Sequence, residues 1–286
     1  MRENSKMEYS VRQNRSQKGL TIERFLTYLI FLSILFFFGY LLFSKIFIKD
    51  SKPVNEVEVK EKIVDEKKEE VREIVVKSEF KTIDGQSAYI AFDENAKDDA
   101  KYPVVIYSHG STYTVSDNPN NPLTKDLDYY ADIFVKNGYV FAASNQHGDN
   151  WGKEPAIGDT KKLVEELEKS YKSNGEIYLL GFSMGGLVTM NFAEKYPENI
   201  KKIALLAPTS YVNTWNATRV ERIKEIPIKI WHGNKDVNVP YSMSTNLIKK
   251  FSSLGKEIEF ITVEGVGHFD IDTEYTDAIV EFYKSQ

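Results

Sequence analysis

Ser183 lies in the segment 181–185 (GFSMG), between an apolar run at 176–180 and a helix-like segment at 186–193. A serine with glycines two positions before and after it, where a strand meets a helix, is typical of a nucleophile elbow. Such a turn needs neighbours without side chains, because strand and helix almost collide there. The N-terminus of the following helix also favours a developing negative charge. The sequence therefore predicts a strand–turn–helix unit that presents a reactive serine, with a plain N-cap serine as the alternative.

An acid and a base follow Ser183 in the order that a catalytic triad requires. Asp236 lies in the loop 234–240 after a strand-like run, and His268 follows the strand-like run 258–263 in a glycine-containing loop. A serine nucleophile needs a base to take its proton, and the base needs a carboxylate to orient it. The sequence therefore predicts a triad of Ser183, Asp236 and His268.

The chain has four histidines, which leaves few rivals to His268 as the base. His109 lies in a loop where a structural role is expected. His232 ends a strand, where we expect a hydrogen-bonded packing role. His147 lies on a loop near the expected pocket, so a contact with substrate or with another site residue stays open as an alternative.

Two other carboxylates compete with Asp236 for the role of orienting the base. Asp149 is the better rival, because Asp270 lies only two residues after His268 and would be awkwardly placed. The histidines and carboxylates do not show the spacing of metal ligands, so no metal site is predicted. The chain also lacks a Walker-type loop and a dinucleotide fingerprint, and we expect no cofactor.

A further apolar run, 103–107, ends in a Ser-His-Gly-Ser segment at 108–111. Hydrolases with a nucleophile elbow take one oxyanion-hole N–H from such a loop and the other from the residue after the nucleophile. By position, the donors are Met184 and either Ser111 or Gly110. Losing one such donor typically costs about 2.7–4 kcal/mol of transition-state stabilisation.

Over roughly residues 73–286 the chain resembles the α/β-hydrolases, and within them the dienelactone-hydrolase-like group with its small carboxylesterases and acetylhydrolases. The likeness is carried by the segments 103–110, 130–140 and 181–186. Dienelactone hydrolase itself uses a cysteine nucleophile, whereas this chain has no cysteine. The resemblance therefore implies a serine carboxylesterase with a three-layer α/β-hydrolase fold.

The pattern of apolar runs agrees with a mainly parallel sheet, because strands and helices alternate along the chain. The site should then lie at the carboxyl ends of the strands. We expect strands at 73–77, 87–92, 103–107, 139–143, 176–180, 203–207, 228–233 and 258–263. We expect helices near 123–137, 159–173, 186–193 and 241–254, with a last one after His268.

The substrate is less constrained than the chemistry. Residues 208–226 leave no room for a large lid between two core strands. Aromatic side chains on loops near the expected pocket suggest a modest apolar acyl or alcohol group in a small or medium acyl ester, with a packing role for each as the alternative. These candidate substrate-binding residues are Tyr113, Trp151, Tyr211 and Trp215. A serine peptidase or amidase with the same triad and a catalytically silent binding module on the same scaffold are the alternatives.

The N-terminal quarter differs in composition from the rest. A polar tail at 1–24 precedes an uncharged run of twenty residues, Phe25 to Ser44. At 1.5 Å per residue such a run spans the roughly 30 Å core of a bilayer. A cleaved signal peptide is the alternative, but its apolar region is normally shorter and no small-residue cleavage site follows. We therefore expect a transmembrane anchor at 25–48, so that the membrane is a partner of the chain.

Orientation follows from weaker signals. Residues 5–24 and 45–64 each carry five lysines or arginines, so the positive-inside count is tied. Acidic residues partly offset the positive charge on the C-terminal side of the run. Long C-terminal domains also translocate largely regardless of charge. We expect a cytoplasmic N-terminus and an extracytoplasmic domain at 73–286.

The Lys- and Glu-rich segment 49–72 should form a charged stalk, with a short helix as the alternative. The net charge of −5 gives no basic footprint for nucleic acid.

Overall fold

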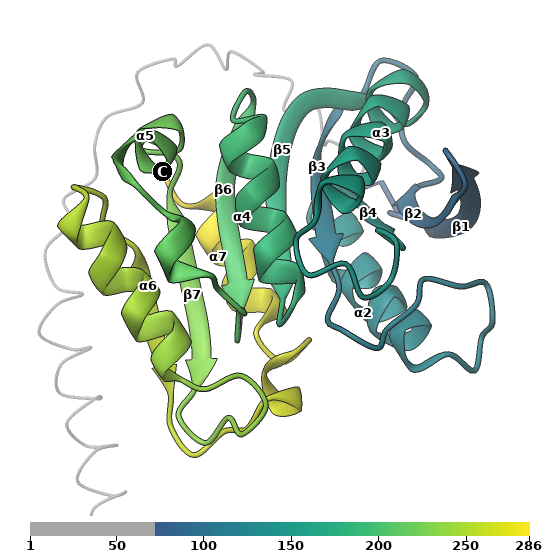
Figure 1. Ribbon diagram of the computed structural model, residues 1–286. Coiled ribbons are helices and arrows are strands. Elements are labelled where there is room, and N and C mark those ends of the chain that lie inside the picture. The colour runs from purple at the N-terminus through teal and green to yellow at the C-terminus, as the bar shows by residue number, and fades with distance from the viewer. Residues whose placement is uncertain (1–71) are drawn as a thin grey trace, which may run out of the picture. The chain divides into compact units, whose positions relative to one another are not determined.

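The computed structural model describes residues 72–286, which build an eight-stranded sheet with helices on both faces (Figure 1). The strands run in the spatial order β1-β2-β4-β3-β5-β6-β7-β8. β1 pairs antiparallel with β2, and β2 with β4, whereas every pair from β4 to β8 is parallel. The prediction of a mainly parallel α/β sheet is thus confirmed. The strands are β1 (Val76–Ile83), β2 (Gln86–Asp93), β3 (Tyr102–Ser108), β4 (Val140–Ser144), β5 (Ser173–Phe182), β6 (Ile200–Leu206), β7 (Ile228–Gly233) and β8 (Glu259–Val263).

The helices cover the two faces of the sheet as two separate apolar clusters. On one face, α3, α4, α5 and α6 bury residues such as Leu163, Phe192 and Phe251 against the strands; on the other, α2 and α7 bury residues such as Phe134 and Phe282. In Figure 1 the first group lies in front of the sheet and α7 behind it. The elements are α2 (Pro122–Lys136), α3 (Glu154–Ser170), α4 (Gly185–Lys195), α5 (Ala217–Arg222), α6 (Ser242–Ser253), α7 (Thr276–Lys284) and the 3₁₀ helices η1 (Val212–Thr214) and η2 (Phe269–Ile271).

The first strand lies further along the chain than the sequence indicated. Strand-forming residues at 74–76 suggested a strand at 73–77, but β1 begins at Val76 and continues to Ile83. The hairpin turn sets this register, because Asp84 and Gly85 both have positive φ, at 48° and 81°. Two such residues form the turn that matches the twist of paired strands, and Ile83 consequently pairs with Gln86.

The second long helix also starts earlier than expected. The sequence indicated a helix near 159–173, whereas α3 runs from Glu154 to Ser170 and β5 follows at Ser173. Pro155 accounts for the early start, since proline fits the first turn of a helix, where its missing N–H needs no partner.

The predicted polar tail at 1–24, the anchor at 25–48 and nearly all of the stalk at 49–72 lie outside the described residues. Between residues 72 and 286, no helix combines the length and the apolar character needed to cross a membrane. The anchor therefore stays a prediction from the sequence.

Candidate active site

Ser183 lies at the junction of β5 and α4 in a strained backbone conformation. Its φ of 53° is in the left-handed region, which is uncommon for a residue with a side chain. The next strand holds it there: the Ser183 N–H donates to the Leu206 carbonyl at 3.0 Å, and the Ser183 carbonyl accepts from the Thr209 N–H at 2.8 Å. The strand–turn–helix unit predicted from the sequence is present.

Two glycines permit the crowding around this turn. A Cβ atom at Gly185 would collide with the backbone carbonyl of Ser108 at the end of β3. A Cβ atom at Gly181 would collide with the hydroxyl of Thr189 on α4. β5, α4 and the end of β3 therefore approach more closely than any side chain would allow.

Ser183, His268 and Asp236 form a continuous chain of hydrogen bonds. His268 Nε2 lies 2.9 Å from Ser183 Oγ, and His268 Nδ1 lies 2.6 Å from Asp236 Oδ2. The His268 and Asp236 side chains are 4% and 0% exposed. Because the carboxylate faces Nδ1, that nitrogen carries the proton and donates it, which leaves the Nε2 lone pair directed at the serine hydroxyl. The arrangement can therefore move the serine proton to the imidazole.

The Asp236 carboxylate is held by its own loop as well as by imidazole rings. Its Oδ1 atom accepts the backbone N–H groups of Asn238 and Val239 at 2.9 and 2.8 Å. Its Oδ2 atom accepts from His268 and lies 3.2 Å from His232 Nε2. A carboxylate with four donors keeps a fixed orientation, so the base is oriented in turn.

His232 is buried beneath this acid loop, and its tautomer follows from its partners. Nε2 faces the Val239 carbonyl at 3.0 Å as well as Asp236, and both are acceptors, so Nε2 carries the proton. Nδ1 then accepts from the Ser244 hydroxyl at 2.7 Å. Burial lowers the pKa of His232, which favours this neutral form. The sequence indicated a packing role here; the direct contact with Asp236 gives His232 a second role in positioning the acid.

The predicted oxyanion-hole residues lie beside the serine. A cavity of about 300 Å³ is lined by Gly110 and Ser111 together with Ser183 and His268. Within the described part of the chain, the backbone N–H groups of Gly110, Ser111 and Met184 donate to no other group. Free donors from both segments next to a serine hydroxyl are what an oxyanion hole requires.

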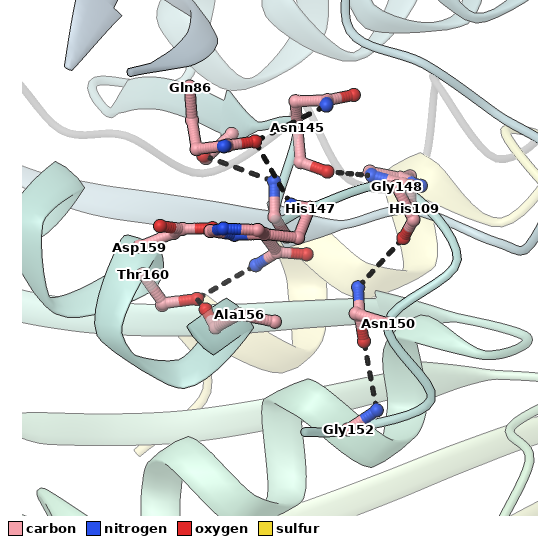
Figure 2. Close-up of polar contacts among 12 residues, drawn as sticks. Gln86, His109, Asn145, His147, Gly148, Asn150, Gly152, Ala156, Asp159 and Thr160 are labelled. Carbon is pink, nitrogen blue, oxygen red and sulfur yellow. Dashed lines mark hydrogen bonds and ion pairs between the residues drawn. The ribbon is translucent and has the colours of Figure 1, made fainter. Parts of the chain in front are cut away.

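The loop from Asn145 to Gly152 braces this cavity. Its backbone is unusual, with positive φ at Gln146, His147, Gly148, Trp151 and Gly152. Figure 2 shows how polar contacts within the loop and to α3 hold that shape, with Asp159 beside the His147 ring. His147 Nδ1 lies 2.6 Å from Asp159 Oδ2, so the imidazole ring is held by a side chain of α3.

The same loop contacts the segment 109–115, which contains the proposed oxyanion donors, at three points. The Asn145 carbonyl lies 3.0 Å from His109 Nε2 (Figure 2), and the Asn145 side-chain oxygen accepts the Val115 N–H at 3.1 Å. Asp149 Oδ1 accepts the Thr112 N–H at 2.6 Å. Asp149, the rival for orienting His268, therefore orients the loop after Ser111 instead.

The four predicted substrate-binding aromatics divide between two cavities. Tyr113 and Trp151 line the cavity around Ser183. Tyr211 and Trp215 line a neighbouring cavity, which Trp151 also borders. Trp215 is buried and packs edge-on against Phe251 of α6, with ring centroids 4.8 Å apart. The structure thus does not bring all four aromatics together around the serine.

Sequence reasoning missed an aromatic contact that holds His268 and a buried carboxylate in the segment after it. The Phe182 ring stacks on the imidazole with centroids 5.0 Å apart. Asp272, four residues further on, is buried and accepts the hydroxyl of Tyr130, while Tyr107 Oη lies 3.5 Å away. Burial raises the pKa of Asp272 to about 6. The position of Phe182 within the GFSMG motif was a usable signal, whereas nothing local marks the contacts of Asp272.

Comparison with known proteins agrees with this geometry. Residues 141–285 match the family described as Phospholipase/Carboxylesterase. This match covers half of the chain and includes the serine, the acid and the base. The chain belongs to that family. That family's description is one of enzymes that act on carboxylic esters.

A Mycoplasma pneumoniae protein named "Putative esterase/lipase 3" is 31% identical over 134 residues, which are 46% of this chain and 45% of that protein. The match thus spans less than half of the relative's length. Among solved structures, Est1E from Butyrivibrio proteoclasticus has a TM-score of 0.53 at 18% identity. The match covers 72% of this chain and 96% of that one. An acylaminoacyl peptidase from Pyrococcus horikoshii has a TM-score of 0.56 at 16% identity, covering 75% of this chain and 42% of that one. These two structures share the fold of this family member, and a fold by itself does not fix the substrate.

Proposed function

We propose that the chain is a membrane-anchored serine carboxylesterase that cleaves small or medium acyl esters through Ser183, His268 and Asp236. The observation that carries this proposal is the continuous hydrogen-bond chain from Asp236 through His268 to Ser183 Oγ. It ends in a cavity bordered by Gly110 and Ser111. Family membership supports the ester as the substrate class.

In the first half of the proposed reaction, Ser183 Oγ attacks the ester carbonyl carbon while His268 Nε2 takes the hydroxyl proton. The N–H groups of Ser111 and Met184 stabilise the negative charge that develops on the carbonyl oxygen. When the tetrahedral intermediate collapses, the C–O bond to the alcohol breaks. The alcohol leaves with the proton from His268, and an acyl group stays on Ser183.

In the second half, water takes the place of the alcohol. His268 removes a proton from water, the hydroxide oxygen bonds to the acyl carbon, and the bond to Ser183 Oγ breaks. Ser183 recovers its proton from His268, and the carboxylic acid leaves. Asp236 stays ionised throughout and stabilises the imidazolium that forms in each half.

The ester preference is tested with full-length protein in detergent. We expect hydrolysis of p-nitrophenyl acetate and no comparable hydrolysis of aminoacyl p-nitroanilides. Among the described residues, those that line the cavity at Ser183 include no acidic, lysine or arginine side chain that could bind a peptide terminus. A kcat/KM for the anilides equal to that for the ester would instead favour a peptidase. Hydrolysis of neither substrate would favour a silent binding module on the same scaffold.

The membrane part of the proposal rests on the sequence of residues 25–48. Its uncharged run has the length of a bilayer span, and burial of some twenty apolar residues is effectively irreversible. We propose that the N-terminus is cytoplasmic and that the catalytic domain faces outward.

This arrangement makes a prediction about cell fractions. The protein should stay in the membrane fraction through washes with high salt and with alkali, and protease added to intact cells should remove the domain. Protection of the domain until the cells are broken would reverse the orientation. A soluble, shortened protein would show that the segment is a cleaved signal peptide.

A further inference from the structure

A second cavity of about 120 Å³ adjoins the cavity that contains Ser183. Trp151 and Thr209 line both, so the two spaces share a boundary. Thr209 is also tied directly to the nucleophile, since its N–H donates to the Ser183 carbonyl at 2.8 Å. The second cavity is therefore adjacent to the reacting centre.

The walls of the second cavity combine apolar side chains with neutral polar ones such as Asn191, Thr209 and Ser210, which suits an uncharged group. Leu187 and Met190 line it from α4, and Trp215 lines it from the opposite segment. Among the described residues that border the cavity, the one charged side chain is Arg219, and each of its three guanidinium nitrogens already has a partner. Arg219 Nη2 donates to Asn191 Oδ1 at 2.9 Å, Nη1 donates to the Thr214 carbonyl at 3.2 Å, and Nε lies 3.4 Å from the Glu194 carboxylate. A carboxylate on the substrate would have to displace these partners.

The position of His268 decides which half of an ester would enter this cavity. His268 has to protonate the leaving alcohol, so the alcohol must lie on the side of the site bordered by the imidazole. His268, Phe269 and Val239 line the first cavity and do not line the second. The second cavity is lined instead by Gly186, Leu187 and Trp215, none of which lines the first. The group it can receive without blocking proton transfer is the acyl chain.

We propose that the cavity bordered by Trp151, Leu187, Thr214 and Trp215 is the acyl pocket, and that it selects short, uncharged acyl chains. This inference rests on the proposed esterase function and adds the acyl length. A dry cavity of about 150 Å³ holds a benzene ring, which has six carbons. A cavity of about 120 Å³ therefore takes about five carbons beyond the carbonyl, which corresponds to acyl chains up to hexanoate.

The test varies only the acyl chain of the substrate, using p-nitrophenyl acetate, butyrate, hexanoate and decanoate with the full-length protein. Each methylene buried in the pocket should raise kcat/KM by about fourfold until the pocket is full. The wild type should therefore prefer butyrate or hexanoate to acetate and should lose this gain at decanoate.

Filling the pocket should remove that preference. Thr214 is exposed on η1 and lines the cavity, so Thr214→Trp adds bulk without disturbing the core. We expect the ratio of kcat/KM for hexanoate to that for acetate to fall by about sixteenfold, the value of two lost methylenes. Asn213→Trp is the matched control, because Asn213 is exposed on the same 3₁₀ helix and lines neither cavity. It should leave both esters nearly unchanged.

Acetate hydrolysis reports on folding and on the triad independently of the pocket. If Thr214→Trp lowered acetate hydrolysis as well, Thr214→Met would supply a smaller filling, and a shift of preference towards acetate would still support the acyl pocket. An unchanged hexanoate-to-acetate ratio in the filled variants, with acetate still hydrolysed, would overturn the acyl pocket and leave the esterase function standing. Absence of acetate hydrolysis in the wild type would overturn both.

Discussion

Ser183→Ala is expected to reduce kcat for p-nitrophenyl acetate by about 10⁶-fold, the loss seen when a serine hydrolase loses its nucleophile. The hydroxyl is the only group in the hydrogen-bond chain that can attack the ester, and it sits 2.9 Å from His268 Nε2. The fold should persist, because alanine carries the same Cβ atom as serine. It can therefore adopt the φ of 53° that Ser183 already has. Far-ultraviolet circular dichroism and initial rates measure the two effects.

Ser111→Ala is the matched control for this variant. Ser111 borders the same cavity, but its proposed contribution is a backbone N–H, which alanine retains. Its kcat should stay within a few-fold of the wild type. Near-normal hydrolysis by Ser183→Ala would remove Ser183 from the mechanism, and an equal loss in both variants would point to damage of the cavity rather than of a nucleophile.

Asp236→Asn is expected to lower kcat by about 10⁴-fold with the fold intact, because an amide favours the wrong tautomer of the base. The Asn238 and Val239 N–H groups hold the oxygen that asparagine keeps. The new NH₂ group then faces His268 Nδ1, which has to accept rather than donate. His268 Nε2 consequently carries the proton and cannot take the one on Ser183.

Asp149→Asn and Asp270→Asn separate this effect from a general loss of negative charge. Asp149 contacts the Thr112 N–H and not the imidazole, and Asp270 is exposed. Asp270→Asn should therefore be almost neutral, and Asp149→Asn should cost far less than Asp236→Asn. A larger loss from Asp149→Asn than from Asp236→Asn would transfer the orienting role to the rival carboxylate.

The sequence was most informative where local chemistry dictates local structure. The GFSMG segment predicted the turn at Ser183 between β5 and α4. Its two glycines are needed because neighbouring segments approach too closely there for a side chain. Alternating apolar runs predicted the parallel sheet, and a parallel sheet brings loops after successive strands to one edge. For this reason Ser183, Asp236 and His268, far apart in the chain, could be expected to meet.

Contacts that depend on tertiary packing could not be read in this way. The Asp236 contact of His232 requires the acid loop to fold back over β7, and the Asp272 contacts join its loop to α2 and β3. The aromatics on the segment after β6 looked equivalent in sequence. Only the course of that segment around η1 turns Tyr211 and Trp215 towards a second cavity.

Labelling by a fluorophosphonate tests the central claim most directly, since the probe reacts with a serine only when base and oxyanion donors activate it. Ser183 Oγ should displace fluoride from phosphorus, so that wild-type protein gains one phosphonyl group, located by mass spectrometry on the peptide that contains Ser183. Ser183→Ala should remain unlabelled, and Asp236→Asn should label far more slowly. An unlabelled wild-type chain that still hydrolyses esters, or a label on another residue, would contradict the account.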